Sequence, residues 1–247
     1  MGTQTRARRD WSTRSPEAEL MDDADVSFEE FRSCLADLAR VNRVTLTHRP
    51  VLNFFDRLLS AGAFPRTRPL RVLDVGSGYG DLLRAVRGWS RRRGVAMSLT
   101  GVDLSPWSRR AAIEATPADD DIDWITADAF AYEPVDPPDV IVSSQFTHHL
   151  PDPEVERFLR WMEEQATLAW LVNDLHRHPV PYHFFRHFSR LANYHHFVRH
   201  DGPVSIARSF VKGDWRRALK AAGIESEDAT IRWEIPFRLT VERVKHA

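Results

Sequence analysis

A turn rich in glycine follows a short apolar run and could hold a ligand against the backbone. Gly76, Gly78 and Gly80 are spaced by two residues, and an acid, Asp74, precedes them. Glycine adopts positive φ without strain and lets a ligand approach closely, so residues 70–81 predict a strand, a binding turn and the start of a helix. A dinucleotide fingerprint needs its third glycine at position 81, where the sequence has aspartate. The spacing therefore counts against a dinucleotide at this turn.

Two more acids follow the next two predicted strands. Asp103 ends the extended run 96–103, close to the position at which nucleotide-binding sheets place a carboxylate on the ribose hydroxyls. A carboxylate suits that role because its two oxygens can each accept from one of two neighbouring hydroxyls. Asp128 stands just after the run 122–127. Because ligands of open α/β sheets bind outside the carboxyl ends of the strands, we expect both acids and Asp74 to face one site.

A histidine that could act on a bound hydroxyl follows the predicted strand 140–144. His149 lies in the loop that leads to Leu-Pro-Asp at 150–152. The near-neutral pKa of imidazole suits removal of a phenolic or enolic proton. A histidine that orients the loop or packs beneath the ligand would look the same in sequence, so both interpretations stay open. His148 is a second candidate for contact with the substrate.

In their order and spacing, these motifs resemble the class I S-adenosylmethionine (SAM)-dependent methyltransferases over residues 68 to 175. The resemblance implies that the protein binds SAM, releases S-adenosylhomocysteine (SAH) and methylates a phenolic or enolic hydroxyl on a polyketide- or quinone-like apolar acceptor. Methylation at carbon is a second form of the same reaction. A finer similarity to the ubiquinone and menaquinone type, and to a bacterial subgroup associated with type III polyketide synthases, lies at 19–23, 41–43, 173–177 and 200–203.

The resemblance also implies roles for single residues. Asp103 would bind the ribose, Asp128 would accept from the adenine amino group, and the backbone N–H that follows would reach a ring nitrogen. His149, or else His176, would be the base. The implied cofactor-binding residues are Asp74, Gly76, Ser77, Gly78, Gly80, Asp103, Leu104, Asp128, Ala129 and Ser144. The implied substrate-pocket residues are His148, Asn173, Arg177, Tyr182 and Phe185.

Alternating strand and helix patterns predict the elements that position these residues. We expect an α/β fold with a Rossmann-like, doubly wound sheet of seven strands, mostly parallel, with a C-terminal antiparallel hairpin. Two amphipathic helices precede the glycine turn, the first after a capping box at Ser27 and Glu30. We divide the chain into residues 1–66, a tail and helices covering the site, and residues 67–247, a methyltransferase domain with a helical cap inserted after the fifth strand at about 176–210.

Histidine and aromatic residues concentrate between the fifth predicted strand and the next helix. Seven of the eleven histidines lie at 176–200, interleaved with aromatic rings that suit a flat or long apolar substrate. No cysteine accompanies these histidines, as one would in many zinc sites. The fourth strand ends in Ser-Ser-Gln at 143–145, where a magnesium site of the catechol type would need an acid. We therefore expect no metal.

Net charge, apolar runs and short motifs indicate which partners and which cellular location the sequence predicts. The formal net charge is -1, so no nucleic acid partner is predicted. The Asp-Pro-Pro-Asp run at 136–139 precedes its strand, whereas the similar motif of base-methylating enzymes follows it. No apolar run is long enough for a membrane span, residues 1–6 match neither a secretion nor a myristoylation signal, and Cys34 is the single cysteine. These features predict a cytoplasmic protein with a small-molecule acceptor, and they leave the oligomeric state open.

Two other functions remain open at this stage. An NAD(P)-dependent oxidoreductase would share the fold and the acid on the ribose, although Asp81 replaces its third glycine. A non-catalytic scaffold that binds SAM could keep all three acids at the strand ends.

Overall fold

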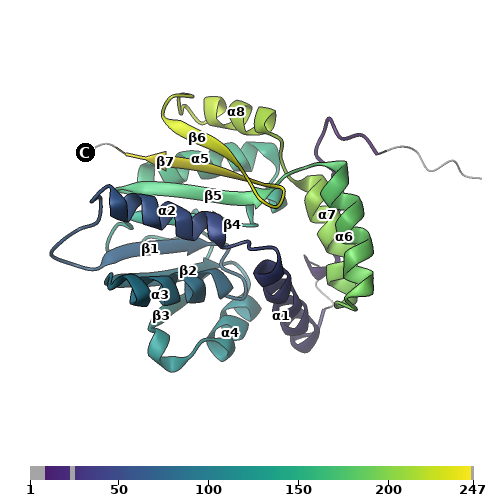
Figure 1. Cartoon of the computed structure of the whole chain (residues 1–247), viewed down its shortest axis with the longest axis horizontal. Coiled ribbons are helices and arrows are strands. Elements are labelled where there is room, and N and C mark those ends of the chain that lie inside the picture. The colour runs from purple at the N-terminus through teal and green to yellow at the C-terminus, as the bar shows by residue number, and fades with distance from the viewer. Residues whose placement is uncertain (1–8, 23–25, 246–247) are drawn as a thin grey trace, which may run out of the picture.

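One mixed sheet of seven strands forms the centre of the protein (Figure 1). The computed structural model describes residues 9–22 and 26–245. The strand order is β3-β2-β1-β4-β5-β7-β6. The five parallel strands are β1 (Leu70–Val75), β2 (Met97–Asp103), β3 (Ile122–Thr126), β4 (Val140–Ser144) and β5 (Ala169–Leu175). The antiparallel hairpin consists of β6 (Ala229–Glu234) and β7 (Arg238–Val244), which pairs with β5. The predicted fold class is confirmed.

Helices cover both faces of this sheet (Figure 1). On one face, α2 (Arg49–Ser60) and α3 (Asp81–Arg93) bury apolar side chains such as Phe55 and Leu83 against the strands. On the other face, α5 (Asp152–Gln165) and α8 (Lys212–Ala221) bury side chains such as Phe158 and Trp215. The central strands β4 and β5 are therefore buried along nearly their whole length, as expected of parallel strands covered on both sides. Helix α4 (Pro106–Ala115) lies beside β2 and β3. The described part of the chain also contains the short 3-10 turns η1 (Leu20–Asp22), η2 (Ala118–Asp120) and η3 (Thr147–His149).

Three further helices stand beyond the carboxyl ends of the parallel strands (Figure 1). The first, α1 (Phe28–Val44), begins at the predicted capping box, in which the Ser27 hydroxyl accepts from the Glu30 N–H. The other two, α6 (Pro179–Leu191) and α7 (His196–Arg208), follow β5 within the span predicted for the cap. Phe31 and Leu35 of α1 share a small apolar core with Phe197 of α7. The three helices therefore form one wall above the strand ends.

Residues 9–22 run along this wall and are held by hydrogen bonds. The Arg14 guanidinium donates to the backbone carbonyls of His148 and Leu150 at 3.0 and 2.9 Å. The backbone N–H groups of Leu20 and Met21 donate to the Asp201 carboxylate of α7 at 2.8 and 3.0 Å. The prediction about N-terminal signals concerns residues 1–6, which lie outside the described residues. Within the described ranges, no helix is both long enough and apolar enough to cross a membrane.

Candidate active site

A cavity of about 1030 Å³ opens at the carboxyl ends of the parallel strands. Its floor is made by the loops after β1, β2, β3 and β4, and its walls come from α1, α6, α7 and the turn between β6 and β7. The predicted site residues that line it are Gly76, Ser77, Gly78, Asp103, Leu104, Asp128, Ala129, Ser144, His148, His149 and Phe185. The chain therefore brings most of the predicted cofactor residues to one hollow with the two histidines.

The three glycines of the binding turn have positive φ values of 71°, 49° and 74°. A Cβ on Gly76 would lie 2.6 Å from the Phe146 ring, and one on Gly80 would lie 2.3 Å from the Trp124 ring. A Cβ on Gly78 would meet no atom within 4 Å, because this glycine borders the cavity. Two of the glycines are thus needed for packing, and the third leaves open a cradle that a side chain would fill.

Two of the predicted acids are oriented by backbone hydrogen bonds. Asp103 accepts from the N–H of Gly78 at 2.8 Å through Oδ2 and from the N–H of Ser105 at 2.9 Å through Oδ1. Asp128 accepts from the N–H of Phe130 at 2.9 Å. A carboxylate has about four acceptor positions, so each acid can still accept from a ligand in the cavity. Their placement fits the ribose and adenine roles implied by the resemblance.

Asp74 lies buried behind the turn, away from the cavity lining. Its Oδ1 atom has no hydrogen-bond partner. Burial raises the pKa of the Asp74 carboxyl well above its ordinary value, and the nearby charges of Asp81 and Asp103 raise it further. The carboxyl groups of Asp74, Asp81 and Asp103 are therefore gathered around the glycine turn, and Asp74 is the one whose ionisation is disfavoured.

A polar chain that the sequence analysis missed connects the first helices to this turn. His48 Nε2 lies 2.9 Å from Asp81 Oδ2, and the Asn42 amide donates to the same oxygen at 3.0 Å. Burial raises the pKa of the Asp81 carboxyl, but the hydrogen bonds and charge of His48 outweigh it and hold that pKa below its ordinary value. Gln145 donates from Nε2 to Asn42 Oδ1 at 2.6 Å. The ends of α1 and β4 are thus joined beside the cavity.

The histidine loop is anchored by a buried carboxylate at the end of β5. Asp174 is fully buried and accepts from the Thr147 hydroxyl, from the backbone N–H of His148 at 3.0 Å and from the Leu175 N–H at 2.7 Å. Its Oδ1 also lies 2.7 Å from His148 Nδ1. These contacts fix the His148 ring, whose Nε2 side faces the cavity wall.

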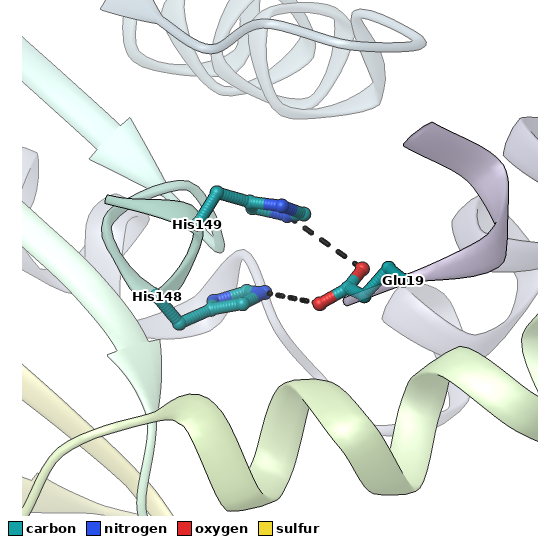
Figure 2. Close-up of side chains that lie close together, drawn as sticks. All are labelled: Glu19, His148 and His149. Atoms are coloured by element: carbon teal, nitrogen blue, oxygen red, sulfur yellow. Dashed lines mark ion pairs between the residues drawn. The ribbon is translucent and has the colours of Figure 1, made fainter. Parts of the chain in front are cut away.

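Glu19, from the N-terminal segment, completes a cluster with the two histidines (Figure 2). The Nε2 atoms of His148 and His149 lie 3.7 and 3.8 Å from Oε1 and Oε2 of Glu19. One ligand atom from each residue lies within 4.8 Å of the others, so these side chains could together hold a metal ion. The Ser205 hydroxyl donates to Glu19 at 2.9 Å. In the sequence, residues 19–23 indicate only a resemblance, and no local pattern assigns a role to Glu19.

A large part of the cavity wall is apolar. Side chains from α1, α6, α7 and the β6–β7 turn surround this part of the cavity, among them Phe31, Leu35, Leu38, Val180, Phe184, Phe185, Phe188, Val198 and Phe237. Aromatic and aliphatic walls with a few polar groups are typical of sites for small organic ligands.

Several predicted site residues lie elsewhere. The Arg177 guanidinium is buried and donates to the carbonyls of Trp11, Ser12 and Ser209, so it holds the N-terminal segment. Neither Asn173, which is buried beside Thr47 and Ser144, nor Tyr182 lines the cavity, and Gly80 packs on Trp124. His176 is also off the cavity lining, and burial, followed by the charge of His178, lowers its pKa. The catalytic and binding roles of the whole set stay predictions.

Known proteins share this architecture. A family described as "Methyltransferase domain" matches residues 46–227. No curated protein sequence matches the chain. Magnesium protoporphyrin IX methyltransferase (ChlM) from Synechocystis PCC 6803 with bound SAH is 16% identical, with a TM-score of 0.55, and the match covers 91% of this chain and 90% of that one.

Two other solved structures show the same fold. Human N-acetylserotonin methyltransferase in complex with SAM is 17% identical with a TM-score of 0.60, and the match covers 90% of this chain and 57% of that one. The plantazolicin methyltransferase BpumL, in complex with a pentazolic desmethylPZN analog and SAH, is 15% identical with a TM-score of 0.55, covering 90% of this chain and 87% of that one.

Proposed function

The chain belongs to the methyltransferase-domain family, and from that premise we propose that it transfers the methyl group of SAM to a phenolic or enolic hydroxyl on a small apolar acceptor. The observation that carries the proposal is that one cavity joins the glycine cradle, the oriented acids, the two histidines and an apolar wall. The family match counts against the nicotinamide oxidoreductase. Cys34, the single cysteine, supports a reducing, cytoplasmic location.

SAM supplies a methyl group on a positively charged sulfur that is already a good leaving group. On this proposal, Asp103 binds the ribose hydroxyls and Asp128 binds the adenine amino group, since both line the cavity and both are held by backbone hydrogen bonds. Gly78 leaves the space that the cofactor needs. The Asp81 carboxylate, whose pKa is held below its ordinary value, lines the cavity and favours the positive charges of the cofactor electrostatically.

The acceptor lies between the apolar wall and the histidine loop. Aromatic side chains of α6 and aliphatic side chains of α7 suit a polyketide- or quinone-like ring or chain. His149 assists loss of the hydroxyl proton, because it borders the cavity whereas His176 does not. Holding the hydroxyl oxygen in line with the methyl group and removing one proton supply most of the acceleration that such a transfer needs.

The test of this function is direct. Purified protein is incubated with SAM and a panel of phenols and alkyl-substituted resorcinols, and SAH and methyl ether are measured together. We expect the two products in equal amounts, and calorimetry should show SAH binding that Asp103→Ala abolishes. Glu114→Ala, an exposed acid on the neighbouring α4, is the matched control. SAH binding without turnover of any acceptor would favour the non-catalytic scaffold, and absence of SAH binding would reject the proposal.

A further inference from the structure

The cluster of Glu19, His148 and His149 has the geometry of a metal site. The two imidazole rings lie side by side with centroids 4.4 Å apart, and both direct Nε2 toward the same carboxylate (Figure 2). Separations of 3.7 and 3.8 Å between Nε2 and the carboxylate oxygens exceed the length of a hydrogen bond. The three side chains point toward one another, but these atom pairs are too far apart for direct hydrogen bonds.

The contact of His148 with Asp174 determines which nitrogen of the His148 ring can accept on the side of Glu19. Nδ1 lies 2.7 Å from Asp174, a carboxylate that accepts, so Nδ1 is the protonated nitrogen that donates. In the neutral ring this leaves the Nε2 lone pair directed toward Glu19, which is itself an acceptor. A positive ion between these acceptors satisfies both of them.

Outer contacts of the cluster resemble those that orient metal ligands. A ligating histidine commonly donates its other ring nitrogen to a carboxylate, as His148 donates to Asp174. Glu19 is fixed by the Ser205 hydroxyl at 2.9 Å. Arg14 joins the N-terminal segment to the backbone of the histidine loop at 3.0 Å. The ligands are thus held by groups from three separate parts of the chain.

We propose that Glu19, His148 and His149 bind one divalent transition-metal ion and that this ion activates the acceptor hydroxyl, an inference that rests on the proposed methyl transfer. Two imidazoles and one glutamate are a donor set that zinc enzymes use with a fourth position open. Roughly 3.3 Å separates the ligands of a tetrahedral ion with bonds of about 2.0–2.1 Å. The two histidine–carboxylate pairs, which end on different oxygens of Glu19, are wider by roughly half an ångström. One ligand atom from each residue lies within 4.8 Å of the others, so the side chains would draw together around an ion.

In the proposed transfer, each bond that forms is matched by one that breaks. The hydroxyl oxygen occupies the open position, where the positive ion lowers the pKa of the O–H group, and the proton leaves to water. The O–CH3 bond then forms as the S–CH3 bond breaks, and both electrons of the broken bond stay on the sulfur of SAH. His149 acts as a ligand in this scheme and assists proton loss through the ion.

Metal binding is measured on the full chain after removal of metals with EDTA and dialysis. Calorimetry with Zn²⁺ should give one ion per chain, and Co²⁺ should give the intense visible absorption of a four-coordinate site. Glu19→Gln should weaken Zn²⁺ binding by more than the about 10–100-fold that loss of an outer partner costs. Glu17→Gln, which changes an exposed acid two residues away, should leave it unchanged.

The possible results distinguish failure of the metal site from failure of the proposed function. Equal Zn²⁺ binding by Glu19→Gln and Glu17→Gln would place the ion elsewhere, such as on the histidine-rich cap, and would overturn the site. Methyl transfer at the same rate in EDTA and in Zn²⁺ would overturn the metal and leave His149 as the base, with the proposed function intact. Zn²⁺ bound at the cluster without methylation of any acceptor would overturn both activation and the proposed function.

Discussion

Three glycines with similar backbone angles offer a stringent test of the cofactor cradle, because their surroundings differ. Gly76, Gly78 and Gly94 have φ values of 71°, 49° and 66°. An alanine at each position carries the same left-handed strain of about 1–2 kcal/mol. At Gly94, which ends α3, the new Cβ meets nothing within 4 Å, so Gly94→Ala reports the strain alone. Thermal unfolding should show a fall in Tm of about 2–8 °C, since each kcal/mol shifts a domain of this size by about 2–4 °C.

The other two variants add one effect each to that strain. The Cβ of Gly76→Ala would lie 2.6 Å from the Phe146 ring and force it to move, which adds about 1–3 kcal/mol of overpacking and a correspondingly larger fall in Tm. The Cβ of Gly78→Ala meets no protein atom and should lower Tm no more than Gly94→Ala does. It projects at the cavity, however, so calorimetry with SAH should show a loss of binding that Gly94→Ala does not share. Equal SAH affinity in these two variants would refute the claim that Gly78 leaves space for the cofactor.

Three further predictions follow from buried groups and from the N-terminal segment. Asp74→Asn should stabilise the ligand-free protein relative to wild type increasingly as pH rises above about 4, because the raised pKa of Asp74 makes its ionisation costly in the folded state. A pH-independent difference in unfolding free energy would contradict this. Burial raises the pKa of the Cys34 thiol to about 12, so a disulfide reagent at pH 8 should react with unfolded but not with native protein, and rapid native reaction would contradict it. Arg14→Ala should lower the free energy of unfolding by about 2 kcal/mol or more, because two backbone carbonyls of the histidine loop lose a charged donor. The control Arg9→Ala breaks an exposed ion pair and should lower it by less than about 1 kcal/mol. Equal losses in the two variants would show that the segment is not held through Arg14.

Local patterns in the sequence were enough to predict the sheet and one side of the site. Alternation of apolar runs and helical stripes predicts the seven strands, and an acid after a strand must lie at the edge where ligands bind. Asp103 and Asp128 line the cavity for this reason. The glycine spacing predicted the turn because positive φ restricts the residue type at those positions.

Contacts between distant segments could not be predicted in this way. Glu19 and His148 are 129 positions apart in the sequence (148 minus 19), and no local periodicity connects the two. Polar residues near the end of β5 also looked alike in sequence, yet their side chains diverge. Arg177 turns to the backbone of residues 11 and 12, and Asn173 turns to Thr47 and Ser144. The strand end is set by local pattern, whereas the direction of each side chain depends on what packs against it.

The most direct test of the proposed methyl transfer uses SAM labelled with deuterium in its methyl group and an alkyl-substituted phenol as acceptor. Mass spectrometry should find one labelled methyl group on the phenolic oxygen for each SAH formed. His149→Ala, which removes a cavity-lining imidazole, should lower that rate by about 100-fold or more while SAH binding persists. An unchanged rate in His149→Ala, or SAH formation that no hydroxyl acceptor stimulates, would contradict the proposed reaction.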